Sequence, residues 1–106
     1  MTGPGPMLDL RAERADGRIV VRVEGEIDLA NAATFADAVR EHLDQGPVTV
    51  DLGGLTFMDS SGIKALDALI ADATDGGRDL AFGPDLQHGV RAVLQLTGLL
   101  ELLPRT

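Results

Sequence analysis

The sequence predicts a single α/β domain in which helices flank a mixed central β-sheet. β-Branched runs suited to strands alternate with segments whose apolar residues recur every three or four positions, as in amphipathic helices. The first two strand-like runs are separated only by a tight turn, which adds an antiparallel hairpin to parallel strands joined by crossover helices. A chain of 106 residues suits one compact core. The expected order of elements is ββαβαβα.

The first elements are an N-terminal arm and a hairpin. Residues 1–6, MTGPGP, are rich in glycine and proline without an apolar period, so they are interpreted as a flexible arm before a domain spanning residues 7–106. In residues 8–12 apolar and polar side chains alternate, and residues 19–23 form a β-branched run. Ala15-Asp16-Gly17 supplies the turn between these two strands.

A first helix is predicted from about Asn31 to Gln45, because its apolar stripe has helical spacing. Asp28 or Asn31 is suited to cap its amino end, and Gly46-Pro47 ends it. The stripe consists of Phe35, Val39, His42 and Leu43.

The next predicted elements are a short third strand, Val48 to Leu52, and a second helix that begins after Asp59. Gly53-Gly54 begins the loop between them, and Gly76-Gly77 ends the helix. The inward positions of this helix are Ile63, Leu66, Leu69, Ile70 and Ala73.

The C-terminal third of the chain is expected to add a strand at Leu80–Phe82 and a third helix from about Leu86 to Thr97. Gly98 breaks this helix. The leucine-rich tail that follows is expected to complete the core, with room for a short last strand near Leu102. The tail contains Leu99, Leu100, Leu102 and Leu103.

Composition argues against several classes of function. The formal net charge of −8 and the lack of tryptophan and tyrosine disfavour binding to nucleic acid. With no cysteine, only His42 and His88 remain as imidazole ligands, so no metal site is expected. No apolar run approaches the roughly 18 to 20 residues of a membrane-spanning helix, and the start lacks a leader pattern. We therefore expect a cytoplasmic protein without membrane insertion.

Residues Phe57-Met58-Asp59-Ser60-Ser61-Gly62 stand at the junction of the third strand and second helix. The first backbone N–H groups of a helix have no intrahelical acceptor and lie at the positive end of its dipole, so they favour an anion such as a serine phosphate. Asp59, Ser60 or Ser61 also suits a simple helix cap, worth about 1 kcal/mol. The residue types alone leave both interpretations open.

Three segments stand out together, namely Gly25-Glu26-Ile27-Asp28, Val50 to Leu55 and Phe57 to Gly62. They resemble the family of STAS domains, named for sulphate transporters and anti-sigma factor antagonists, and within it the free-standing bacterial antagonists. The resemblance runs from about Leu8 to Leu103. Family members usually continue into a further C-terminal helix, and they often have a small residue at the position of Lys64. The three segments are Gly25-Glu26-Ile27-Asp28, similar to a strand-to-helix signature; Val50 to Leu55, similar to the third strand and its following loop; and Phe57 to Gly62, similar to the phosphorylation motif.

The resemblance implies roles for individual residues. It makes Ser60 the expected phosphorylated residue, with Ser61 and then Thr56 as alternatives. Recognition by a partner kinase is expected to involve Asp28, Asp59, Ser61 and Gly62, although Asp28 is equally suited to cap a helix and Gly62 to allow close backbone packing.

The function implied by the resemblance is that of an anti-sigma factor antagonist without enzymatic activity or cofactor. Unmodified protein would bind a serine-kinase anti-sigma factor and free a sigma factor, phosphorylation would release it, and a serine phosphatase would reverse the modification. An alternative is the STAS subunit of an ABC-type transport system for lipids or solutes, docked on its ATPase. Ser61 to Lys64 also fits the S-x-x-K pattern of serine hydrolases, but 106 residues cannot supply the partner motifs that such enzymes need.

Overall fold

The computed structural model describes residues 8–105 and shows the expected α/β architecture with a mixed sheet. The predicted arm at residues 1–6, together with Met7 and Thr106, lies outside the described residues. The elements in chain order are β1 (Leu8–Ala15), β2 (Arg18–Ile27), α1 (Ala32–Leu43), β3 (Val48–Met58), α2 (Ser60–Asp75), β4 (Leu80–Phe82), α3 (His88–Leu96) and the 3₁₀ helix η1 (Leu99–Leu102).

The strands lie in the order β1-β2-β3-β4, with β1 antiparallel to β2 and the remaining pairs parallel. Asp16 and Gly17, between β1 and β2, have φ values of 55° and 78°. Two consecutive positive φ values are typical of the type I′ turn, whose twist matches that of a two-stranded hairpin. The predicted hairpin is therefore confirmed.

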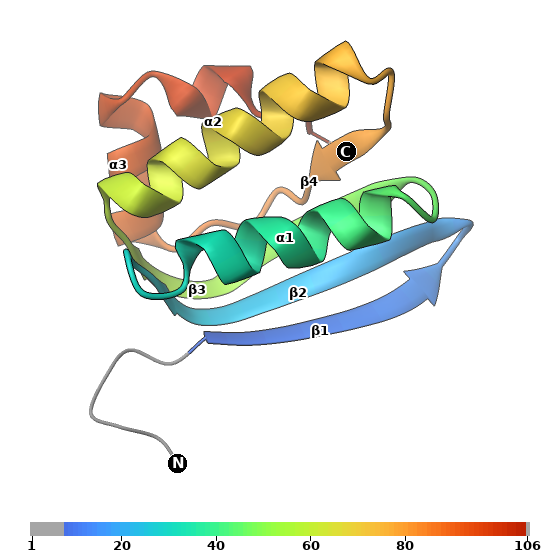
Figure 1. Cartoon of the computed structure of the whole chain (residues 1–106). Helices are drawn as coiled ribbons and strands as arrows, with labels where there is room; N and C mark the ends of the chain where they lie inside the picture. The colour runs from blue at the N-terminus through green and yellow to red at the C-terminus, as the bar shows by residue number, and fades with distance from the viewer. Residues whose placement is uncertain (1–7, 106) are drawn as a thin grey trace.

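Helices α1 and α2 contact each other and lie side by side over one face of the sheet (Figure 1). Alternate residues of β2 point into this layer, and Ile19, Val21, Val23 and Ile27 are buried. Burial of each such side chain stabilises the fold by about 1.5–3 kcal/mol. On the opposite face of the strand, Arg22 is exposed and forms an ion pair with Glu13 of β1 at 2.8 Å. The sheet thus has a covered face and a largely polar face.

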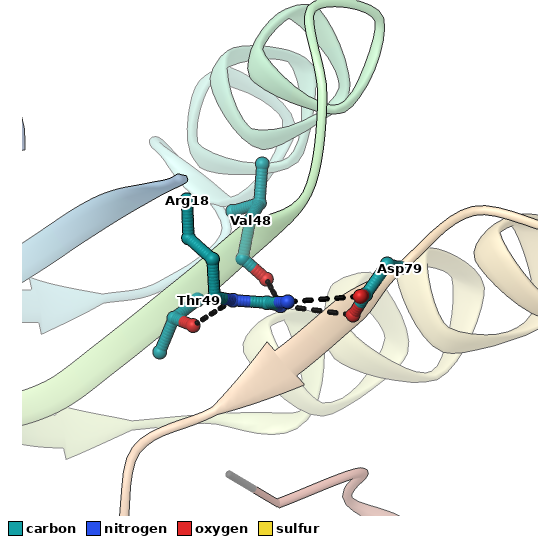
Figure 2. Close-up of polar contacts among 4 residues, drawn as sticks. All are labelled: Arg18, Val48, Thr49 and Asp79. Atoms are coloured by element: carbon teal, nitrogen blue, oxygen red, sulfur yellow. Dashed lines mark hydrogen bonds and ion pairs between the residues drawn. The ribbon is translucent and has the colours of Figure 1, made fainter. Parts of the chain in front are cut away.

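A hydrogen-bonded arginine joins the strands at the amino end of the parallel pairing (Figure 2). Nε of Arg18 donates to Oγ1 of the buried Thr49 at 2.9 Å, and one terminal nitrogen donates to the carbonyl of Val48 at 2.9 Å. The guanidinium also donates to both carboxylate oxygens of Asp79, at 2.8 and 2.9 Å. These bonds raise the pKa of Arg18 and hold the pKa of Asp79 below its usual value.

The third strand is longer than predicted, because β3 continues to Met58 instead of ending near Leu52. The register of its pairing with β2 shifts along the strand. Arg22 pairs with Asp51, and the next pair is Glu24 with Gly54, so β3 contributes one residue more than β2 between these two pairs. This extra residue is a bulge, and it lets the pairing continue through the segment that was expected to form a loop. Only Asp59 separates β3 from α2.

The C-terminal region also departs from the prediction. Helix α3 begins at His88, two residues after the expected start at Leu86, and ends at Leu96. Instead of a short strand, Leu102 lies in η1, and a single parallel bridge pairs Arg105 with Phe82. Leu99 and Leu103 are buried and complete the core, whereas Leu102 is exposed. In residues 8–105, no helix is long and apolar enough to span a bilayer.

Candidate functional site

The candidate site lies where β2 and β3 end on the same edge of the sheet. Ile27 pairs with Met58, and the backbone N–H of Asp59 donates to the carbonyl of Ile27 at 3.2 Å. This arrangement brings the loop after β2, which carries Asp28, next to the start of α2, which carries Ser60. Two segments that the sequence singled out separately therefore meet at one place.

Asp59 caps helix α2. Its backbone is extended, and its carboxylate accepts hydrogen bonds from the N–H groups of Ser61 at 2.8 Å and Gly62 at 3.3 Å. The capping interpretation is thus confirmed for Asp59, and such a cap stabilises a helix by about 1 kcal/mol. A carboxylate of the chain itself therefore occupies two of the N–H groups at the start of this helix.

Ser60 is the first residue of α2 and is exposed, whereas Ser61 is half-buried. In the described part of the chain, the Ser60 hydroxyl takes no part in an intramolecular hydrogen bond. Thr56 is also exposed, but its hydroxyl donates to the carbonyl of Gly25 at 3.0 Å. Of the three candidate hydroxyl groups, that of Ser60 is both exposed and without such a bond. Phosphorylation of Ser60 stays a prediction.

Gly62 allows the start of α2 to pack closely against the strand ends. The residue is buried, and a Cβ placed on it would lie 2.4 Å from Cγ of Met58 and 3.0 Å from Cγ2 of Ile27. The packing role considered for this glycine is therefore confirmed. Any part in recognition would be indirect, through the position that it gives Ser60 and Ser61.

The loop between β2 and α1 is held by Asp28 and Asn31, but neither side chain caps α1. Oδ1 of Asp28 accepts from the N–H of Ala30 at 2.9 Å. The Asn31 amide bridges backward, since its oxygen accepts from the N–H of Asp28 and its nitrogen donates to the carbonyl of Glu26, each at 2.9 Å. Asn31 occupies the predicted N-cap position of α1, but its side chain makes no capping hydrogen bond, and Asp28 is not the cap. Sequence reasoning missed the bracing role of Asn31, although its spacing of three residues from Asp28 was a usable signal.

Two exposed apolar side chains accompany the acidic groups at this edge. Leu29, in the β2–α1 loop, is 83% exposed, and Phe57, near the end of β3, is 48% exposed. Glu26 is opposite Phe57 in the strand pairing. The sequence analysis did not identify Leu29, and it named Phe57 only as the first residue of the segment that ends at Gly62. Exposed apolar side chains that stand singly are common on protein surfaces, so these two side chains do not by themselves indicate a binding surface.

Three hollows of the surface lie away from this edge. Two of them, of about 280 and 320 Å³, open around Arg78, at the opposite end of α2 from Ser60. In residues 8–105, no group of three or more histidine, aspartate or glutamate side chains is arranged to hold a metal ion. Ser60 lies outside these three hollows and is exposed on the Ser60 edge, the surface formed by the carboxyl ends of β2 and β3 and the start of α2.

Comparisons with known proteins agree with this architecture. The model of the STAS domain family matches residues 9–106. The BtrV protein of Bordetella bronchiseptica, provisionally named an anti-sigma factor antagonist, is 24% identical over 99 residues, which cover 92% of this chain and 84% of BtrV. The crystal structure of an anti-sigma factor antagonist from Mycobacterium paratuberculosis is similar, with a TM-score of 0.81 and 26% identity, covering 99% of this chain and 89% of that one.

A third similarity concerns the fold alone. The Bacillus cell fate determinant SpoIIAA, solved in its phosphorylated form, has a TM-score of 0.65 and 19% identity, with 92% of this chain and 91% of that chain covered.

Proposed function

Because this chain belongs to the STAS domain family, we propose that it is an anti-sigma factor antagonist controlled by phosphorylation of Ser60. Unmodified protein binds a serine-kinase anti-sigma factor and thereby frees a sigma factor, and the phosphorylated protein dissociates. A serine phosphatase returns it to the binding form. The observation that carries the proposal is the exposed Ser60 hydroxyl at the first position of α2, in the place of the family's phosphorylation motif.

Similarity supports the choice of partner class. BtrV and the Mycobacterium paratuberculosis protein both carry the name of anti-sigma factor antagonist, and both match nearly the whole chain. SpoIIAA, which shares the fold, has a phosphorylated form. Asp59 and Ser61 adjoin Ser60 in sequence, and Asp28 follows the paired end of β2. These are the groups that we expect an incoming kinase to contact.

The surface chemistry gives a physical reason for release. A phosphate adds about −1.5 to −2 charges and three acceptor oxygens to a contact region built around a neutral hydroxyl. The surrounding edge already carries the carboxylates of Glu26, Asp28 and Asp59, so the added charge enlarges a negative surface. Desolvation of the phosphate and like-charge repulsion then weaken the complex.

The same proposal assigns no catalysis, cofactor, metal or nucleic acid to this chain and places its action in the cytoplasm. ATP and Mg²⁺ belong to the kinase. The negative net charge of −8 favours a protein partner with a basic surface over a nucleic acid.

The experiment that tests the function combines capture and site mapping. Immobilised chain is used to capture partners from an extract of its source cells, with and without Mg-ATP; the captured proteins and the phosphorylated residue are identified by mass spectrometry. We expect a complex without ATP, one phosphate on Ser60, and loss of the complex after modification. The Ser60→Ala variant should bind but remain unlabelled, and Ser61→Ala should still be labelled.

Three outcomes contradict parts of the proposal. Phosphate found only on Ser61 or Thr56 refutes the site, and an absence of binding refutes the partner class. Capture of a transport ATPase instead of an anti-sigma factor favours the transport alternative.

A further inference from the structure

Lys64 is the one lysine of the chain, and it is exposed on α2 four residues after Ser60. Side chains at positions i and i+4 of a helix are neighbours, with Cβ atoms about 5–6 Å apart. Lys64 is also the single basic residue of α2, which otherwise carries the acidic residues Asp67, Asp72 and Asp75. The only ammonium group on this helix therefore lies within reach of the Ser60 side chain.

Among residues 8–105, Lys64 has no competing ion pair. All the ion pairs in the described part of the chain use arginine, namely Arg11, Arg18, Arg22, Arg40 and Arg78. The nearest acidic residue on the same helix, Asp67, forms no ion pair with Lys64 either. In the unmodified protein, the ammonium group is thus available to an anion that appears beside it.

The Asp59 cap restricts where a phosphate on Ser60 can go. The carboxylate already accepts the N–H groups of Ser61 and Gly62, so a phosphate gains these two donors only by displacing a negative group that belongs to the helix. Repulsion from Asp59, and from Asp28 in the adjacent loop, disfavours that exchange. The exposed side of α2, where Lys64 lies, offers the phosphate a positively charged neighbour instead.

We propose that Lys64 receives the phosphate of modified Ser60 in an intrahelical ion pair that forms only in the phosphorylated protein. This inference rests on the proposed modification of Ser60. The pair holds the phosphate against α2, away from the Asp59 cap, and favours its doubly ionised form. Lys64 is therefore a positioning residue that fixes the place of the phosphate on the surface from which the partner is released.

The test uses full-length protein in which phosphoserine is inserted at position 60 during translation, so no kinase is required. The second ionisation of the phosphate is followed by ³¹P NMR in the otherwise native chain and in Lys64→Gln. Removal of the ammonium group should raise the phosphate pKa by about 0.2–0.4 unit, the equivalent of an i,i+4 ion pair. Lys64→Arg keeps the charge and should leave the pKa within about 0.1 unit of the native value.

A second measurement follows the lysine itself. Because the chain has one lysine, its Cε resonance is assigned without ambiguity. As pH is varied, this resonance should shift with the same midpoint as the phosphate resonance. Arg11→Gln serves as the matched control, since it removes one exposed positive charge from β1 and should leave the phosphate pKa unchanged. An unchanged phosphate pKa in Lys64→Gln, or an equal change in Arg11→Gln, overturns the proposal.

The two proposals fail in distinguishable ways. If no kinase modifies Ser60, the proposed function fails, yet the inserted phosphate still reports on Lys64. If Ser60 is modified and the partner is released, but the Cε resonance of Lys64 does not follow the phosphate, only the ion pair is refuted. Spectra of unmodified Lys64→Gln should match those of the native chain, which separates loss of the pair from a change of fold.

Discussion

Arg18 and Asp79 form a paired contact in which the guanidinium donates to both carboxylate oxygens, at 2.8 and 2.9 Å. The contact joins the first residue of β2 to the residue before β4, although the two are 61 positions apart in sequence. Because the same guanidinium also binds Thr49 and the carbonyl of Val48, it fixes the amino ends of three parallel strands. The Ser60 edge lies at the other end of β2 and β3.

Replacement of Arg18 by alanine should destabilise the domain by about 1–3 kcal/mol, because the buried Thr49 hydroxyl and the Val48 carbonyl lose their donor. Urea unfolding followed by circular dichroism measures the change. Arg11→Ala removes an exposed arginine whose one ion pair within residues 8–105 is with Asp9, and it should cost no more than about 0.5 kcal/mol. Equal effects of the two variants would contradict the importance of the Arg18 contacts.

The contribution of Asp79 should depend on pH. Hydrogen bonds from Arg18 hold the Asp79 pKa below its unfolded value of about 3.9, so the stabilisation is present above that value and is lost as pH falls through the lower folded pKa. The native chain should therefore be more stable than Asp79→Asn at pH 7, with the difference shrinking below about pH 4. Thermal unfolding across this pH range tests it. Since Asp79 is largely exposed, added salt should reduce the difference.

Gly62→Ala should destabilise the fold by about 1–3 kcal/mol, because the added methyl overlaps Met58 and Ile27. Gly89→Ala is the matched control: it lies in α3, and a Cβ there would have no neighbour within 4 Å. In a helix this second change should stabilise by about 0.5–1 kcal/mol. Opposite signs in denaturant unfolding are the expected result, and destabilisation by both variants would remove the steric explanation.

Asp59→Ala should lower stability by about 1 kcal/mol through loss of the α2 cap, whereas Asp59→Asn keeps an acceptor oxygen and should cost less. Amide hydrogen exchange at Ser61 and Gly62 locates the effect. Faster exchange confined to the first turn of α2 is expected. Unchanged exchange in Asp59→Ala would show that the two amides do not depend on this carboxylate.

Ser60→Asp should leave the fold unchanged and weaken binding to the anti-sigma factor, if the proposed function holds. An aspartate at the first position of a helix is tolerated by the dipole, whereas repulsion and a lost desolvated contact at an interface cost about 2–5 kcal/mol, or about thirtyfold to several-thousandfold in affinity. Calorimetry and amide spectra measure both quantities. Gln45→Glu adds the same charge at an exposed position near the start of β3 and should bind normally.

The sequence predicted the elements whose signals are local. The turn at Asp16-Gly17, the apolar period of α2 and its end at Gly76-Gly77 depend on neighbouring residues, and each agrees with the structure. The length of β3 could not be predicted in this way, because residues past Leu52 become strand only through bulged pairing with β2, which is distant in sequence.

The sequence predicted which residue types make up the site, but it did not predict which hydrogen bonds their side chains form. A cap at the start of α2 was expected, and which of three residues provides it depended on the extended backbone of Asp59. The Asn31 side chain forms hydrogen bonds with the backbone of Glu26 and Asp28 instead of with the first N–H groups of α1. The periodicity of the sequence does not show which of these hydrogen bonds forms. The exposure of Leu29 follows from the course of this loop rather than from its sequence.

The hairpin turn at Asp16-Gly17 offers a practical way to immobilise the protein. The turn precedes β2, whereas Ser60 follows the far end of the β2–β3 pair, about ten strand residues or about 30 Å away. The chain has no cysteine, so one introduced at Asp16 would be a unique attachment point for a sensor chip or a fluorophore. A molecule tethered there presents its Ser60 edge to solution in a uniform orientation.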